Sequence, residues 1–211
     1  MERIFLFGAG GHAKVVISVI EEEGLYEPAF LVDDDPRLNS RSVHGYPVIG
    51  GREEFVHAAH KQNVMKGIVA IGDNRHRSLV AQWLCEQGFQ LVRAVHPTAY
   101  VARRVAIGDG CVIMAGVVIN PDTSIGTCAI INTSATVDHD CTVAEGVHIG
   151  PGCRICGGVT IGQGAFIGAG TTVVPGRTIG RNAVVGAGSV VLKDIGDGVR
   201  AAGNPCRPLD G

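Results

Sequence analysis

The chain has few aromatic residues, little net charge and no long apolar run. Aromatic residues make up 5% of the 211 residues, and the net charge is −2 at pH 7 with histidine neutral. So small a charge gives no electrostatic reason to expect nucleic acid or an anionic membrane surface as a partner. No run of about 18 apolar residues is present, and Met1 leads straight into a strand rather than a signal peptide. We therefore expect a cytoplasmic protein that does not insert into a membrane.

The chain does have a repeat with a period of six residues. Valine or isoleucine fills every sixth position of the repeat: Val95, Val101, Ile107, Ile113, Ile119, Ile125, Ile131, Val137, Val143, Ile149, Ile155, Ile161, Ile167, Val173, Ile179, Val185 and Val191. This period fits neither a helix, at about 3.6 residues per turn, nor a half-buried strand, at about two. It is typical of a parallel β-helix, in which three hexapeptides form one coil of about 18 residues.

The residue four places after each aliphatic position is mostly small, which suits the narrow interior of such a prism. Cys111, Cys141 and Cys153 occupy this position, where a thiol acts as a compact hydrophobic side chain. Arg177 is the clear exception. This use of three of the seven cysteines indicates a reducing cytoplasm rather than a disulfide framework. We predict an all-β domain over residues 95–211.

Residues 1–94 follow a different pattern, in which strands alternate with helices. The sequence predicts strands at 3–7, 29–32, 67–71 and 89–92, helices at 14–23 and 75–87, and a loop at 39–51. Three or four strands in a βαβ arrangement make about half of a dinucleotide-binding sheet. We therefore predict a Rossmann-like α/β domain that binds a nucleotide.

Three segments follow strands of this domain and are expected together at the carboxyl edge of the sheet. Gly8–Ala13 matches the G-x-G-x-x-G/A pattern at a strand-to-helix turn, where backbone N–H groups hold phosphate. Asp33–Asp35 and Gly72–Asn74 follow two further strands, at the edge where open α/β sheets bind ligands. A mononucleotide carried on a larger molecule suits the size of the domain. An NAD site and a domain without a ligand are the alternatives.

Three histidines fall within the repeat region: His96, His139 and His148. None occupies an aliphatic or a small position, so none is expected in the core. His96 precedes Pro97 at the domain junction and is expected to be structural. Asp140 follows His139, and a carboxylate beside an imidazole holds one tautomer and raises its basicity, as a general base near neutral pH requires. Because adjacent strand residues point to opposite faces, this contact requires a bend in the backbone.

Other roles for these residues are alternatives. His139 could be a solvated surface side chain. A metal site at His139–Cys141 and His148 would need Cys141 to point outward, and the usual ligand spacing is not met. Cys153 and Cys156 are spaced as C-x-x-C, but they occupy different positions of the repeat, which argues against a redox pair. We therefore expect no metal.

Four motifs resemble one family of enzymes. They are Phe7–Lys14, Ala70–Arg75, Ile131–Cys141 and Gly203–Arg207. Together they resemble the bacterial sugar O-/N-acyltransferases, hexapeptide-repeat proteins with an N-terminal nucleotide-binding-like domain and a left-handed β-helix. This family includes the nucleotide-activated 4-amino-sugar N-acetyltransferases of bacillosamine and perosamine synthesis and the sialic acid O-acetyltransferases. The resemblance covers essentially the whole chain, and its tail departs from the family pattern only at Cys206.

The resemblance implies roles for particular residues. His139 is implied as the general base and Asp140 as the carboxylate that supports it. His148, Ala169 and Ala187 are implied to contact acetyl-CoA, and Gly157 lies one coil beyond His139 and leaves that wall open for the cofactor. Residues implied to contact the nucleotide sugar are Gly10, Gly11, His12, Asp33, Asp34 and Gly72.

The resemblance therefore implies an acetyl-CoA-dependent enzyme that acetylates the 4-amino group of a UDP- or GDP-linked amino-deoxy sugar. His139 would remove a proton from the amine in a direct transfer, without a covalent enzyme intermediate. Members of the family are homotrimers with active sites between subunits, and the same is implied here. Two alternatives stay open. One is O-acetylation of a sialic acid or another sugar hydroxyl, and the other is a non-catalytic hexapeptide scaffold, which would not need His139 and Asp140.

Overall fold

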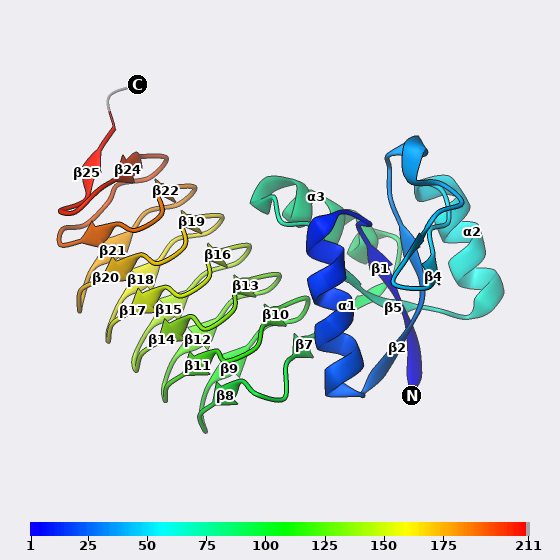
Figure 1. The fold of residues 1–211 in the computed structure, drawn as a ribbon, viewed down its shortest axis with the longest axis horizontal. Helices are drawn as coiled ribbons and strands as arrows, with labels where there is room; N and C mark the ends of the chain where they lie inside the picture. The colour runs from blue at the N-terminus through cyan, green and yellow to red at the C-terminus, as the bar shows by residue number, and fades with distance from the viewer. Residues whose placement is uncertain (210–211) are drawn as a thin grey trace. The chain divides into compact units, whose positions relative to one another are not determined.

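The computed structural model describes residues 1–209, which fall into two compact units (Figure 1). The first spans Met1–Val95 and the second begins at His96. Helices occur only in the first unit of the described chain, and the second is built from short strands and turns. No helix among residues 1–209 is long and apolar enough to span a membrane.

The first unit is built on a four-stranded parallel sheet with the order β2-β1-β5-β6. Its strands are β1 (Glu2–Phe7), β2 (Tyr26–Val32), β5 (Lys66–Val69) and β6 (Gln90–Leu91), and β7 (Ala94–Val95) ends the unit. Its helices are α1 (Gly11–Glu23), α2 (Arg52–Gln62), α3 (Asn74–Glu86) and the short 3₁₀ turn η1 (Pro36–Leu38). The predicted Rossmann-like α/β fold is confirmed.

Aromatic side chains form the centre of this unit. Phe5, Phe7, Phe30 and Phe55 are buried almost completely. The rings of Phe5 and Phe55 lie 4.7 Å apart between centroids in an edge-to-face arrangement. Such pairs add to the stabilisation that burial of their large apolar area provides. Few as the aromatic residues are, the first unit uses them to fix α2 and the sheet against each other.

The structure differs from the prediction between residues 39 and 62. The predicted loop at 39–51 contains an antiparallel hairpin of β3 (Ser42–Val43) and β4 (Tyr46–Pro47). Its turn residues His44 and Gly45 both have positive φ, 49° and 88°, which is the backbone that a tight hairpin requires. The helix α2 was not predicted. Its buried residues are only Phe55 and Ala59, too few for a helical periodicity to stand out.

The second unit winds into a parallel β-helix with three walls, and successive coils pair in register. Wall 1 consists of β8 (Tyr100–Val101), β11 (Val118–Ile119), β14 (Thr136–Val137), β17 (Arg154–Ile155), β20 (Thr172–Val173) and β23 (Val190–Val191). Wall 2 consists of β9 (Ala106–Ile107), β12 (Ser124–Ile125), β15 (Thr142–Val143), β18 (Thr160–Ile161) and β21 (Thr178–Ile179). Wall 3 includes β10 (Val112–Ile113), β13 (Ile130–Ile131), β16 (His148–Ile149), β19 (Phe166–Ile167), β22 (Val184–Val185), β24 (Arg200–Ala202) and β25 (Arg207–Pro208). This architecture is consistent with a left-handed β-helix and confirms the predicted fold.

The interior of the prism follows the repeat. Every aliphatic position from Ile113 to Val191 is buried, and the small position is buried from Cys111 to Thr171. The Sγ atoms of Cys141 and Cys153 donate to backbone carbonyl oxygens of the next coil, Cys156 at 3.2 Å and Gly168 at 3.1 Å. The cysteines of this position therefore act as interior side chains, as predicted. Arg177, the exception, instead lies half-buried near Asp194, 3.8 Å away.

The chain turns between walls through residues with positive φ. At the corner that leads from wall 1 to wall 2, which we call corner 1–2, these residues are Arg104, Asp122, Asp140, Gly158 and Gly176, with φ between 58° and 69°. Glycine adopts this conformation at little cost, and aspartate tolerates it better than most residues. The pattern places one sharp bend in every coil along this edge. The corner from wall 3 back to wall 1 is called corner 3–1.

Candidate active site

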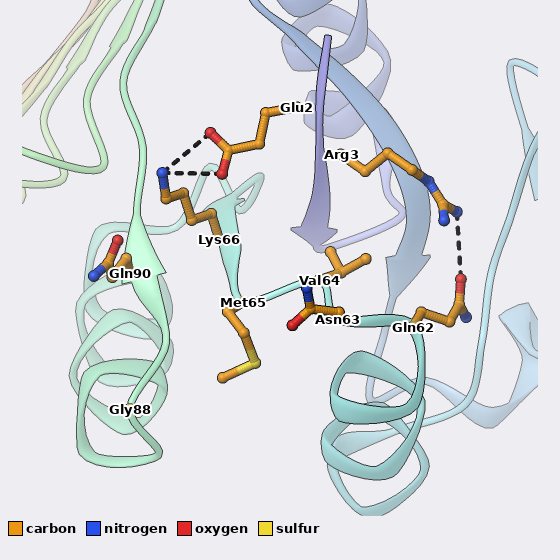
Figure 2. A pocket seen from close by; sticks show the side chains of 9 residues that line it. All are labelled: Glu2, Arg3, Gln62, Asn63, Val64, Met65, Lys66, Gly88 and Gln90. Atoms are coloured by element: carbon orange, nitrogen blue, oxygen red, sulfur yellow. Dashed lines mark hydrogen bonds and ion pairs between the residues drawn. The ribbon is translucent and has the colours of Figure 1, made fainter.

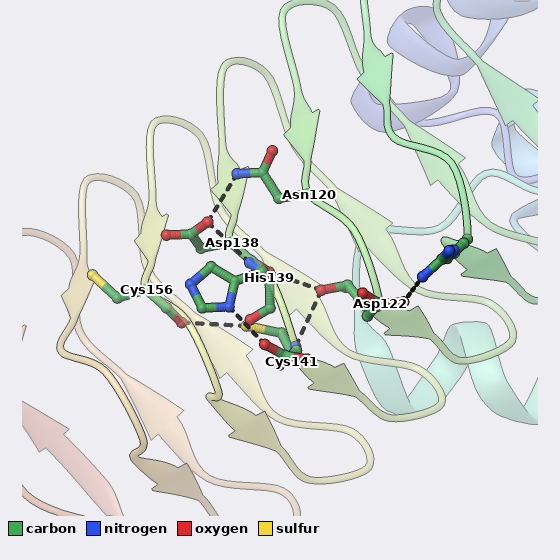
Figure 3. A network of polar contacts seen from close by, with 9 residues as sticks. Asn120, Asp122, Asp138, His139, Cys141 and Cys156 are labelled. Carbon is green, nitrogen blue, oxygen red and sulfur yellow. Dashed lines mark hydrogen bonds and ion pairs between the residues drawn. The ribbon is translucent and has the colours of Figure 1, made fainter.

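His139 lies at corner 1–2, between β14 and β15, with its side chain 61% exposed. Asp140 follows it with φ 58°, so the backbone has the bend that a contact between the two side chains requires. Nδ1 of His139 lies 2.7 Å from Oδ2 of Asp140 (Figure 3). Because an ionised carboxylate only accepts hydrogen bonds, the hydrogen is on Nδ1 and the lone pair is on Nε2. The sequence therefore places an imidazole and a carboxylate in contact at one turn.

The electrostatic surroundings of the imidazole are negative. The hydrogen bond to Asp140 raises the pKa of His139 above its ordinary value of 6.5, and the charge of Asp138 raises it further. The turn itself is held by Thr123 on the preceding coil. Its Oγ1 donates to the carbonyl oxygen of Asp138 at 2.7 Å and accepts from the N–H of Cys141 at 3.1 Å. Both ends of the turn are therefore fixed to the same side chain.

Gly157 lies against the imidazole, one coil further along. A Cβ atom at this position would lie 2.7 Å from Cε1 and 2.8 Å from Nε2 of His139. Gly157 has no positive φ, so its backbone conformation is open to other residues. What requires glycine here is the space that the ring occupies.

His148 is buried, although the six-residue pattern places it outside the interior of the prism. Its side chain points away from the prism interior, next to Ile149, yet it is only 9% exposed. Phe166 of the next coil packs edge-to-face on the ring at 5.2 Å, and Asn132 of the previous coil places Nδ2 3.1 Å from Nε2. A six-residue pattern describes the interior of the prism but not the packing along the outside of a wall, so it could not predict this burial.

Asn132 also fixes the tautomer of His148, a role that the sequence analysis missed. Its Oδ1 accepts the N–H of Thr133 at 2.8 Å, which leaves Nδ2 to donate toward the imidazole. Nε2 of His148 is then the acceptor, so the hydrogen of the neutral ring is on Nδ1. The motif containing Asn132 was visible in the sequence, but its partner one coil away was not.

The residues predicted to contact acetyl-CoA lie on different parts of the prism. His148 belongs to wall 3, and Ala169 and Ala187 are exposed at corner 3–1 on successive coils, where the N–H of Gly188 donates to the carbonyl of Ala169 at 2.8 Å. Gly157 lies at corner 1–2 with His139. Wall 1 separates the two corners within a chain.

In the first unit, the predicted nucleotide residues gather at the carboxyl ends of β1, β2 and β5. Gly10 is the N-cap of α1, and nothing lies within 4 Å of a Cβ placed at Gly10 or Gly11. The first turn of α1 carries no acidic residue, so its N–H groups can donate hydrogen bonds to an anion without competing negative charge. Gly72 lies close to His12, since a Cβ at Gly72 would be 3.9 Å from that of His12.

The two aspartates after β2 already have partners. Asp33 accepts the N–H of Ala9 at 2.8 Å and that of Asp35 at 2.9 Å, so it fixes the glycine-rich turn. Asp34 forms an ion pair with Arg52 at 3.2 Å. The Arg52 guanidinium also lies over the ring of Trp83, 4.8 Å from its centroid. Sequence reasoning missed Arg52 because it lies at the start of α2, the unpredicted helix.

Arg77 is a second residue that the sequence did not reveal. It is completely buried in α3, and its guanidinium donates to the carbonyl oxygens of Ile71 and Gly72 at 3.2 and 3.1 Å and to Oδ1 of Asn74 at 2.8 Å. Arg77 therefore fixes the loop after β5 through hydrogen bonds to its carbonyl oxygens and to Asn74. Helical periodicity predicted the helix but gave no signal that one of its arginines would be buried.

A cavity of about 380 Å³ lies at the opposite, amino-terminal edge of the same sheet (Figure 2). Its lining includes Glu2 and Lys66, which form an ion pair at 2.9 Å, and Arg3, which donates to Gln62 at 3.3 Å. These charged groups thus already have partners, and the cavity lies away from the glycine-rich turn. We do not assign the nucleotide to it. Among residues 1–209, no cluster of three or more His, Cys, Asp or Glu side chains is arranged to hold a metal ion.

Comparison with known proteins finds matches along most of the chain. Residues 3–84 match the family model of the PglD N-terminal domain. Residues 158–193 match the bacterial transferase hexapeptide model, and residues 104–121 and 139–162 match the hexapeptide repeat of succinyl-transferase. A curated relative, UDP-N-acetylbacillosamine N-acetyltransferase of Bacillus subtilis, is 33% identical over 122 residues. That match spans about half of each protein, 54% of this chain and 52% of the relative.

Solved structures match over the full length. A histidine-to-alanine mutant of GDP-perosamine N-acetyltransferase from Caulobacter crescentus, in complex with CoA and GDP-perosamine, is 43% identical with a TM-score of 0.95. The match covers 100% of this chain and 98% of that one. The acetyltransferase domain of PglB from Neisseria gonorrhoeae, in complex with acetyl coenzyme A, is 37% identical with a TM-score of 0.89, and 99% of each chain is covered.

Proposed function

This chain belongs to the family of bacterial nucleotide-sugar N-acetyltransferases of perosamine and bacillosamine type, and on that premise we propose that it transfers an acetyl group from acetyl-CoA to the 4-amino group of a nucleotide-linked amino-deoxy sugar. The observation that carries this proposal is the pair formed by His139 and Asp140, 2.7 Å apart on an exposed turn of the β-helix. A scaffold of the same fold would have no need of an imidazole held in one tautomer with an open Nε2.

Acetyl transfer to an amine requires one proton acceptor. Acetyl-CoA supplies an acetyl group activated as a thioester. Transfer forms one N–C bond and breaks one C–S bond, and the amine loses a proton that Nε2 of His139 takes and then passes to the leaving thiolate. Asp140 holds the ring and stabilises its positive charge while the proton is there. No side chain needs to form a covalent intermediate.

The first unit is proposed to bind the nucleotide. The N-terminus of α1 at Gly10 and Gly11 presents unpaired main-chain donors to a diphosphate. The loop after β5, fixed by Arg77, and the turn fixed by Asp33 would contact the nucleoside. Asp33 remains able to accept from a ribose hydroxyl, because each carboxylate oxygen has a second lone pair.

The test is acetyl-CoA turnover, followed by thiol release, with sugars that differ in one group. GDP-linked 4-amino-4,6-dideoxy sugars come first, because a relative 43% identical was crystallised with GDP-perosamine. The UDP-linked amino sugars form the second arm, and the matching 4-hydroxy sugar nucleotides and sialic acid form the third. We expect rapid turnover of one nucleotide-linked amine. Turnover of a hydroxyl with no amine accepted would overturn N-acetylation and assign the chain to the O-acetyl branch.

We propose further that the enzyme is a homotrimer whose active sites each use two chains. His139 and Gly157 lie at corner 1–2, while His148, Ala169 and Ala187 lie on wall 3 and corner 3–1. Because wall 1 lies between these corners, one chain does not bring His139 to His148, Ala169 and Ala187. A neighbouring copy in a closed ring would bring corner 1–2 of one chain against corner 3–1 of the next. It would also shield His139, which is 61% exposed in the single chain.

Mixing two inactive variants tests this arrangement. Chains carrying His139→Ala or His148→Ala are expected to have little activity alone, and sedimentation velocity should find both trimeric. Mixed trimers formed by co-expression should recover activity, because about one of the three sites in each would combine an intact His139 with an intact His148 from the neighbour. Trimeric mixtures with no recovery would show that both histidines of a site come from one chain.

A further inference from the structure

Asp138, the residue before His139, has a neighbour one coil earlier that the sequence does not place beside it. Strands β11 and β14 pair in register, Val118 with Thr136 and Ile119 with Val137. Asn120 and Asp138 follow these strands at the same level. Both side chains point out of the prism at corner 1–2 and meet there (Figure 3).

One oxygen of Asp138 receives two hydrogen bonds. Its Oδ1 accepts from Nδ2 of Asn120 at 2.9 Å and from the main-chain N–H of His139 at 2.9 Å. These two donors, the His139 N–H first, lower the pKa of Asp138 below its ordinary value of 3.8. The residue is therefore an anion at neutral pH, and its position is fixed by a side chain of the preceding coil.

The main chain of His139 is held on both sides as a result. Its N–H donates to Asp138, and its carbonyl accepts the N–H of Gly158 on the next coil at 2.9 Å. The residue that follows, Asp140, has positive φ, a conformation that surrounding contacts must maintain. Asp140 holds the ring at Nδ1, and the main-chain contacts hold the backbone from which the side chain leaves the turn.

We propose that Asp138, oriented by Asn120, is a positioning residue for His139: it fixes the main chain that carries the imidazole and adds a second negative charge beside it. The inference rests on the proposed role of His139 as the base. It adds two supporting residues, Asp138 and Asn120, which lie on successive coils and are not proposed to touch a reacting atom.

The other charged side chains near this turn make different contacts from those of Asp138. Asp140 contacts the ring directly. Asp122 is the counterpart of Asp140 one coil earlier, and its carboxylate is 53% exposed with Arg104 at 4.0 Å. On the following coil the corner presents Cys156 and Gly157. Asp122→Asn is thus a matched control, since it removes one aspartate charge at the same corner without touching the hydrogen bonds of Asp138.

The experiment compares Asp138→Asn, which keeps an oxygen acceptor and removes the charge, with Asp138→Ala and Asn120→Ala. The first readout is an NMR pH titration of the His139 imidazole in the full-length protein without substrates, with His139→Asn used to assign its signal. Asp138 raises the pKa of His139, so Asp138→Asn should lower that pKa. The acid limb of the kcat/KM profile should then move to lower pH, because the base loses its proton earlier.

The second readout separates positioning from binding. Asp138→Ala should lower kcat by roughly tenfold to a hundredfold, the effect expected of a small misplacement of a reacting group, with KM changed little. Asn120→Ala should have a smaller effect of the same kind, and Asp122→Asn should match wild type in both readouts. Thermal unfolding confirms that each variant folds, and Asp138→Asn decides the matter if Asp138→Ala does not.

Two results would overturn the proposal. One is a His139 titration that is unchanged in Asp138→Asn, or that shifts equally in Asp122→Asn. The other is wild-type kcat in a folded Asp138→Ala variant. If no amine is acetylated by the wild-type protein, the proposed function fails, but the titration still reports whether Asp138 acts on His139.

Discussion

Replacing His139 by alanine is expected to remove nearly all acetyl transfer and to leave the fold intact. General base catalysis contributes roughly 10²–10⁴-fold to rate, so kcat should fall by a factor in this range. The side chain is 61% exposed and is hydrogen-bonded to Asp140 at the same turn, so its loss leaves no cavity in the core. Initial rates of thiol release with saturating acetyl-CoA and amino sugar measure the effect.

A second histidine of the β-helix serves as the matched control. His96 accepts the N–H of Thr98 at 3.1 Å and lies 2.9 Å from its Oγ1, a local contact at the start of the second unit. His96→Ala should therefore keep kcat close to that of wild type. KM for both substrates should stay within a few-fold in His139→Ala, because the imidazole is proposed to act on the proton rather than to hold either substrate. Retention of kcat within tenfold of wild type would mean that His139 is not the base.

The prism could be predicted in detail because its interior leaves little choice. Each coil admits one aliphatic and one small side chain per wall, so the period of six residues states directly which side chains point inward. The pairing register follows as well: Ile119 lies beside Val137 and Ile131 beside Ile149, three hexapeptides apart. Even Cys141 and Cys153 could be placed inside. The position of a residue within its own hexapeptide is enough to predict whether its side chain points inward.

The sequence could not predict the contacts between neighbouring coils or between the ends of different strands. Phe166 and Asn132 are more than a dozen residues away from His148, yet they bury it, since neighbouring coils share an outer face. Asp33 was expected to bind substrate, and the structure shows it also accepting the N–H of Ala9, 24 positions earlier. Arg52 was missed with its helix. In each case the deciding contact joins residues that no single periodic pattern relates.

Gly157→Ala is expected to disable the enzyme without destabilising it. The added Cβ would lie 2.7 Å from Cε1 and 2.8 Å from Nε2 of His139, closer than such atoms can approach. An exposed ring can rotate away more easily than the backbone of two coils can move, so the imidazole should leave Asp140 and the fold should remain. We expect kcat to fall by roughly a hundredfold, as for other misplaced catalytic groups. Loss of the Asp140 contact should also lower the pKa of His139, because that hydrogen bond is the main reason it is raised.

The free energy of unfolding of Gly157→Ala should rise slightly or stay unchanged, although kcat falls. Alanine restricts the unfolded chain, so at a compatible backbone conformation it stabilises by about 0.4–1 kcal/mol relative to glycine. Gly196→Ala is the matched control, since its Cβ would meet only Cγ2 of Val199 at 3.6 Å and its φ is not positive. It should keep wild-type kcat and the same stability as Gly157→Ala. Kinetics, thermal unfolding and the His139 titration together decide the case. Wild-type kcat in Gly157→Ala would show that the imidazole acts from another orientation, and a large loss of stability would show that Gly157 serves the coil rather than the ring.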